Sequence, residues 1–127
     1  MAEARLIKLL LAEDNILLRY TLRGVLRKYS DIEIIGEATD GEEAVMKAAQ
    51  LQPTVVLMDV NMPRLDGIEA TRQIKATAPR IAVIGLSVHT DCFYTDAMLK
   101  AGAVEVLAKE NALQELYNVI QRAIAMV

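Results

Sequence analysis

Residues 54–63 read Thr54-Val55-Val56-Leu57-Met58-Asp59-Val60-Asn61-Met62-Pro63. An apolar run leads into Asp59 and the segment stops at Pro63, which is typical of a short strand buried on both faces. Asp59 is therefore predicted at the carboxyl end of a central strand. In open α/β sheets this end borders the crevice where ligands bind. The stretch thus indicates a parallel sheet with an acid at its ligand-binding edge.

Strands and helices are predicted to alternate on both sides of this stretch. Aliphatic or β-branched runs predict the other strands at residues 6–12, 32–38, 82–87 and 104–108. Apolar residues at helical spacing predict a helix after each strand, and each helix has a candidate N-cap. These caps are Asn15, Asp40, Asp66, Thr90 or Asp91, and Asn111. In the last helix the expected buried stripe comprises Leu113, Leu116, Tyr117, Ile120, Ala123 and Ile124.

The predicted order is five strand–helix units in succession. Such alternation favours an α/β fold, in which right-handed crossovers place helices on both faces of a doubly wound parallel sheet. We expect three layers and the strand order 2-1-3-4-5. The chain has 127 residues, so we expect one domain over residues 1–127.

Composition excludes several classes of protein. No apolar run approaches the roughly 20 residues of a membrane-spanning helix, although 54% of the residues are hydrophobic. The first residues lack the pattern of a signal peptide, and a single cysteine, Cys92, suits a reducing cytoplasm. A net charge of −3 provides no basic surface for nucleic acid. We therefore expect a cytoplasmic domain that by itself binds neither membrane nor nucleic acid.

Polar side chains follow four of the five predicted strands. They are Glu13, Asp14, Asp59, Ser87 and Lys109. In a sheet of order 2-1-3-4-5 these positions converge on one crevice. Three carboxylates there would repel one another and attract a hard cation such as Mg²⁺, while the lysine supplies a counter-charge. Taken singly, each residue has an ordinary explanation as a cap or a solvated loop residue, but their shared position at one edge favours a site.

These residues lie in sequence blocks that resemble the receiver domain of response regulators, the phosphoacceptor module of two-component signalling. The blocks are Leu-Leu-Ala-Glu-Asp at 10–14, Leu-Met-Asp-Val-Asn-Met-Pro at 57–63, Asp-Gly at 66–67, Ser87, and Ala-Lys at 108–109. The resemblance covers essentially the whole chain and implies a flavodoxin-like fold. The segments at 37–44 and 67–71 are most similar to receivers of LuxR-type regulators or hybrid sensor kinases.

The resemblance also implies roles for the site residues. Asp59 would accept a phosphoryl group from a phosphohistidine on a sensor histidine kinase or a histidine phosphotransfer protein. Asp14, Asp59 and the Asn61 carbonyl would bind Mg²⁺ directly, and Glu13 would act through water. Lys109 would pair with the phosphoryl group and Ser87 would donate a hydrogen bond to it. A face formed by the fourth helix, fifth strand and fifth helix would carry the signal, and could mediate self-association.

Two positions depart from the family pattern. Receivers usually carry an aromatic residue three positions before the lysine, where this chain has Val106. The residue after the lysine is usually proline, and here it is Glu110. The first departure implies weaker coupling of the site to the signalling face. The second puts the usual geometry of the lysine loop in question.

Other functions fit the sequence less well. A haloacid-dehalogenase-type phosphatase needs a second aspartate at position 61, which is Asn61, and a serine hydrolase of this fold needs a histidine after His89. Glycine-rich nucleotide-binding motifs are absent. The remaining alternative is a degenerate receiver that acts only as a protein-interaction module. His89 is expected at the mouth of the crevice, where an exposed loop histidine is the ordinary case.

A basic stripe on the first helix has two interpretations. Arg19, Arg23 and Arg27 recur at i, i+4 spacing. They could form a solvated helix face, or they could help to dock the phosphohistidine donor.

Overall fold

The computed structural model describes residues 6–88 and 92–126. His89 and the candidate caps Thr90 and Asp91 lie outside the described residues. Within them the chain forms a five-stranded parallel sheet of order β2-β1-β3-β4-β5, as predicted. The strands are β1 (Ile7–Ala12), β2 (Ile32–Ala38), β3 (Val55–Asp59), β4 (Ala82–Ser87) and β5 (Glu105–Ala108).

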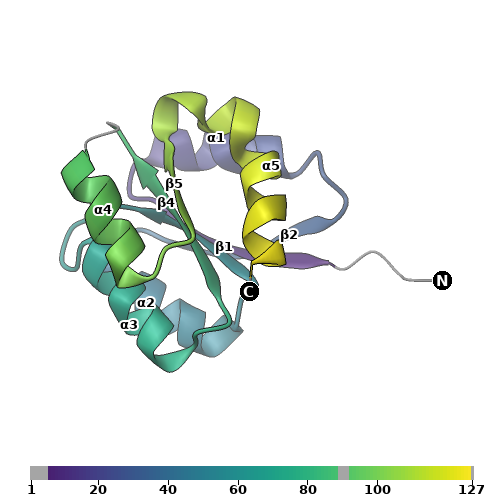
Figure 1. Cartoon of the computed structure of the whole chain (residues 1–127). Helices are drawn as coiled ribbons and strands as arrows, with labels where there is room; N and C mark the ends of the chain where they lie inside the picture. The colour runs from purple at the N-terminus through teal and green to yellow at the C-terminus, as the bar shows by residue number, and fades with distance from the viewer. Residues whose placement is uncertain (1–5, 89–91, 127) are drawn as a thin grey trace.

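Helices cover both faces of this sheet, which gives the three expected layers (Figure 1). One face carries α1 (Ile16–Leu26) and α5 (Ala112–Ala125). The other carries α2 (Gly41–Leu51), α3 (Gly67–Thr77) and α4 (Cys92–Ala101). No helix in the described part of the chain is long and apolar enough to cross a membrane.

Strand β3 lies at the centre and contributes to both hydrophobic cores. Val55 and Leu57 pack beneath α1 and α5, whereas Val56 and Met58 pack beneath α2, α3 and α4. Alternate side chains of a strand point to opposite faces, so a continuous apolar run is what a central parallel strand requires. The prediction for residues 54–59 is confirmed.

Local hydrogen bonds begin three of the helices where the sequence predicts. The carboxylate or amide oxygen of the cap accepts from a backbone N–H three residues on, at 3.0 Å for Asn15, 2.8 Å for Asp40 and 2.9 Å for Asp66. Such bonds satisfy donors that the first helical turn leaves free. Each cap therefore fixes the direction in which its helix leaves the tip of the preceding strand.

The predicted cap and apolar stripe of α5 need correction. A short 3₁₀ turn, η1 (Lys109–Asn111), runs directly into α5, so Asn111 already has near-helical dihedrals and makes no capping bond through its side chain. Leu113 is 46% exposed. The other predicted stripe residues do face the core, with Tyr117 and Ile124 partly buried against it, and the fully buried face follows the helical period around Leu116. It comprises Ala112, Leu116, Val119, Ile120 and Ala123.

Candidate functional site

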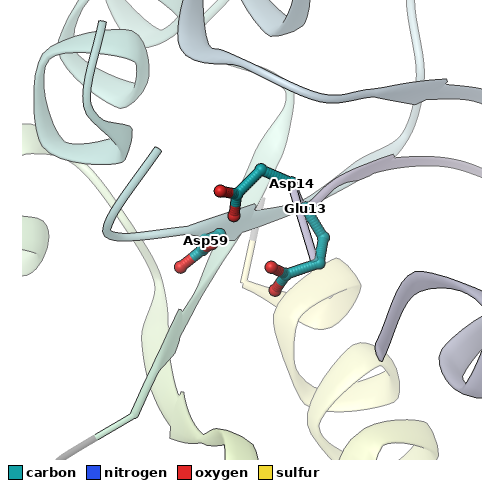
Figure 2. Close-up of side chains that lie close together, drawn as sticks. All are labelled: Glu13, Asp14 and Asp59. Atoms are coloured by element: carbon teal, nitrogen blue, oxygen red, sulfur yellow. The ribbon is translucent and has the colours of Figure 1, made fainter. Parts of the chain in front are cut away.

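The tips of β1 and β3 bring three carboxylates together. Glu13 and Asp14 follow the last residue of β1, and Asp59 is the last residue of β3. Carboxylate oxygens of all three lie within 4.8 Å of one another and face a common space (Figure 2). Glu13 and Asp59 are buried and Asp14 is exposed, so the cluster opens to solvent on the side of Asp14.

Lys109, immediately after β5, supplies the positive charge. Its Nζ lies 3.0 Å from Oε1 of Glu13 and 3.1 Å from Oδ1 of Asp59. The 3₁₀ turn delivers this side chain although Glu110 replaces the usual proline, and the peptide bond between the two residues is trans. The Lys109 side chain is 17% exposed and both carboxylates that it pairs with are buried, so solvent screens these ion pairs less than it screens surface pairs.

One oxygen of Glu13 is poorly satisfied. Oε2 accepts hydrogen bonds from the Asn15 N–H at 3.1 Å and from Lys109 Nζ at 3.3 Å. Oε1 is fully buried and, although Nζ is close to it, accepts no aligned hydrogen bond from the described residues. A buried carboxylate oxygen in this state is costly. Oxygen is the ligand that Mg²⁺ prefers, so the cluster fits a hard divalent cation.

The electrostatics of the cluster show how strongly the acids interact. Burial, followed by the hydrogen bonding and charge of Glu13, raises the pKa of Asp59 to about 8, and Lys109 offsets only part of this effect. Burial alone would lower the pKa of Lys109, but the hydrogen bond and charge of Glu13 and the charge of Asp59 raise it above its ordinary value. Without a cation the three carboxylates outnumber the single ammonium, and Asp59 is the acid whose ionised form is disfavoured as a result.

A change of Asp59 to asparagine tests this conclusion. The pKa of Asp59 is about 8 in the folded chain against 3.8 in an unconstrained one, so the folded state binds more protons between these values. Its free energy of unfolding consequently falls as the pH rises from 4 to 8. Asp59→Asn removes this loss, and we expect it to stabilise the metal-free chain by about 2 kcal/mol at pH 8 and by progressively less toward pH 4.

Urea unfolding in EDTA across this pH range measures the effect. The exposed acid Asp96 offers a control, because Asp96→Asn should leave the pH dependence of the wild type unchanged. Equal pH dependence in Asp59→Asn and wild type would contradict the assignment of the excess charge to Asp59.

Ser87 and Asn61 complete the set of predicted site residues. Ser87 is the buried last residue of β4, in register with Ala108, which directly precedes Lys109. The exposed Asn61 donates its backbone N–H to Oδ1 of Asp59 at 3.1 Å. All six predicted site residues thus lie at the same edge of the sheet.

The sequence interpretation missed an ion-pair network beside this edge. Arg19 and Arg23 do not form a freely solvated face, because both pair with Glu37 on β2, at 2.9 and 2.8 Å. Arg27 is exposed, as a solvated stripe predicts. Spacing on α1 gave no hint of Glu37, since contacts between residues 14 to 18 positions apart depend on how α1 packs on β2.

The family model for the response regulator receiver domain matches residues 9–121. Response regulator GacA of Pseudomonas protegens is 35% identical over 120 residues, covering 94% of this chain and 56% of that protein. Transcriptional regulatory protein LiaR of Bacillus subtilis is 39% identical over 120 residues, with 93% and 56% coverage.

Solved structures agree with the sequence matches. The response regulator domain of Thermotoga maritima CheB superposes with a TM-score of 0.88 at 32% identity, covering 95% of this chain and 98% of that one. The chain spans about half the length of the GacA and LiaR proteins. Fold, strand-tip acids, lysine and family match agree, and the chain belongs to the response regulator receiver domains of two-component systems.

Proposed function

We propose that this receiver is a working phosphoacceptor and that Asp59 takes the phosphoryl group from a phosphohistidine donor. The observation that carries the proposal is the placement of Asp59: it is buried at the tip of the central strand, 3.1 Å from Lys109 and beside two further acids. A receiver domain is a signalling module, and we propose that this one assists its own phosphorylation.

The arrangement suits phosphoryl transfer for an electrostatic reason. A carboxylate approaches a phosphoryl group poorly, because both are negative, so catalysis depends on positioning and on neutralising charge. An Asp59 oxygen forms the new O–P bond while the P–N bond to the donor imidazole breaks, and that nitrogen keeps the electron pair and takes up a proton. Lys109, already held between Glu13 and Asp59, stabilises the negative charge of the transferred group.

The acids would hold Mg²⁺ during this step. Asp14 and Asp59 are proposed direct ligands together with the Asn61 carbonyl, and Glu13 would act through water. When bound, the cation draws charge from the phosphoryl oxygens and favours ionised Asp59. Ser87, at the tip of the neighbouring strand, would donate a hydrogen bond to the phosphoryl group. These roles follow the family resemblance and the shared edge of the sheet.

The alternative of a degenerate receiver, without phosphorylation, is not favoured. In a degenerate receiver the acids and the lysine need not be present or lie close together. Here Lys109 contacts both Glu13 and Asp59. We propose a sensor histidine kinase or a histidine phosphotransfer protein as the donor. The face formed by α4, β5 and α5 would carry the signal onward and could support self-association.

Labelling by a small phosphodonor tests the proposed function. With Mg²⁺ and acetyl phosphate, intact-mass spectrometry should detect one added phosphoryl group, which peptide mapping should place on Asp59. Asp59→Asn should lose the label completely, and EDTA or Asp14→Ala should reduce it strongly, because a metal ligand is removed while the nucleophile remains. The control Asp96→Asn should label like the wild type. Full labelling of Asp59→Asn would overturn the assignment.

Val106 offers a test of how the signal leaves the site. Its methyl groups and the Met98 methyl lie beside Gly85. Receivers usually carry a larger, aromatic side chain at the position of Val106. Valine cannot swing between exposed and buried rotamers with a large change in buried area, so coupling to α4 and α5 should be weak.

Amide chemical shifts measure this coupling. Beryllofluoride should perturb Asp59, Ser87 and Lys109 strongly, but residues 94–100 and 113–120 only modestly. Val106→Tyr should enlarge the response of the two distant ranges. A strong distant response already present in the wild type would show that the signal takes another route.

A further inference from the structure

Arg19 reaches from the second turn of α1 back to the backbone of the acidic pair. Its Nη1 donates a hydrogen bond to the carbonyl oxygen of Glu13 at 2.8 Å. Its Nε donates to Oε1 of Glu37 at 2.9 Å. The side chain is only 13% exposed, and the two bonds hold the guanidinium in one orientation between β1 and β2.

The bond to Glu13 lies where the strand ladder ends. The Glu13 N–H still donates to the Ala38 carbonyl at 3.0 Å, but β1 itself ends at Ala12. The Glu13 carbonyl belongs to the peptide that joins Glu13 to Asp14. With its N–H held by β2 and its carbonyl held by Arg19, Glu13 has a fixed backbone. The direction in which Asp14 leaves that backbone is then fixed as well.

The geometry points to Arg19 as a positioning residue for the metal site: through the Glu13 carbonyl it sets the spacing between the Asp14 carboxylate and the carboxylates of Glu13 and Asp59. This inference rests on the proposed function, since it assumes that these carboxylates hold a divalent cation. Metal sites depend on such outer contacts, and loss of one commonly costs about 10- to 100-fold in affinity.

The proposed effect of Arg19 is geometric and has to be separated from the effect of its charge. Glu37 pairs with Arg19 through Oε1 and with Arg23 through Oε2, the latter at 2.8 Å, so two guanidinium groups share one carboxylate and the three groups keep one positive charge. A lysine at position 19 would keep the charge, but its single point-like ammonium cannot reproduce two hydrogen bonds that diverge from a planar fork. Arg19→Lys therefore separates the two explanations.

Arg23 provides the matched control. It lies one turn further along α1, on the same helix face, and pairs with the same carboxylate, but its hydrogen bond and ion pair in the described structure go to Glu37 and not to Glu13. Arg23→Gln removes a comparable ion pair from the network and leaves the bond to the Glu13 carbonyl in place. Any general loosening of α1 against β2 should appear in both variants.

The experiment is a Mg²⁺ titration of the 127-residue chain followed by amide chemical shifts. We expect Arg19→Lys and Arg19→Gln to weaken Mg²⁺ binding about tenfold, and Arg23→Gln to change it less than twofold. The metal-free Arg19 variants should also shift the amides of Asp14 and Asn15. Urea unfolding establishes that every variant is folded under the titration conditions.

Each other result overturns the inference. Wild-type affinity in Arg19→Lys with weakened binding in Arg19→Gln would mean that charge matters and geometry does not. Equal weakening in Arg23→Gln would mean that α1 packing alone is responsible. Wild-type Mg²⁺ affinity in both Arg19 variants would show that Arg19 does not position the metal site, and would leave the proposed function unaffected. A wild type that binds no Mg²⁺ would overturn the proposed function together with this inference.

Discussion

Lys109→Met is expected to lower the free energy of unfolding by about 3 kcal/mol at pH 8 in the absence of divalent cations. Methionine keeps most of the apolar stem but removes the ammonium that lies 3.0 Å from Glu13 and 3.1 Å from Asp59. Both carboxylates are buried, so neither can regain its solvation without movement of the chain. Breaking a buried ion pair by removing one partner is therefore much more costly than losing a surface pair.

The loss of stability caused by Lys109→Met should depend on pH and on the presence of Asp59. Because the pKa of Asp59 is about 8, this carboxyl is neutral well below that pH and then needs the lysine less. We expect the destabilisation by Lys109→Met to shrink toward pH 5 and to be at least about 1 kcal/mol smaller in an Asp59→Asn background. Mg²⁺ should stabilise Lys109→Met more than the wild type, since the competing cation is gone.

Urea unfolding followed by circular dichroism provides the measurement. Lys100→Met is a suitable control, because Lys100 is exposed on α4 and its replacement should change stability by less than about 0.5 kcal/mol. An equal loss from Lys109→Met in the wild-type and Asp59→Asn backgrounds would show that Lys109 stabilises the chain through its packing and not through Asp59.

Gly67→Ala should lower the free energy of unfolding by a similar amount, but for a different reason. Gly67 begins α3, and its N–H donates to the Val60 carbonyl at 2.9 Å, which folds the helix start onto the tip of β3. A Cβ at this position would lie 2.0 Å from the Asp59 carbonyl oxygen, so backbone must shift. We expect a destabilisation of about 3 kcal/mol, the upper end for overpacking.

The displaced backbone carries Asp59, so Gly67→Ala should also weaken Mg²⁺ binding. Gly24→Ala is the matched control, because a Cβ there meets nothing within 4 Å and Gly24 lies inside α1. That change should stabilise the chain by about 0.5–1 kcal/mol through helix propensity. Near-wild-type stability of Gly67→Ala would show that the α3 start can move without disturbing β3.

The amino-acid sequence by itself determined the order and type of the elements. The apolar run at 55–58 predicted a strand buried on both faces, and the acid at its end placed Asp59 at the sheet edge. The N-caps Asp40 and Asp66 could also be predicted from the sequence, because each capping hydrogen bond joins residues three positions apart and needs no distant partner. The alternation of strands and helices predicted the parallel sheet, and the order 2-1-3-4-5 expected of one doubly wound fold placed the predicted site residues at one edge, as the structure has it.

Tertiary structure decided what depends on distant segments. Asn111 has the residue type of a cap, but the 3₁₀ turn from β5 enters α5 directly and leaves its side chain no capping role. The pairing of Arg19 with Glu37 and the contact of Gly67 with the Asp59 carbonyl arise from the packing of whole elements. The 96-residue separation between Glu13 and Lys109 shows the limit of sequence reasoning. The order of the elements placed both residues at one edge, whereas the burial that raises the pKa of Asp59 depends on the packing of helices and neighbouring strands around the tip of β3.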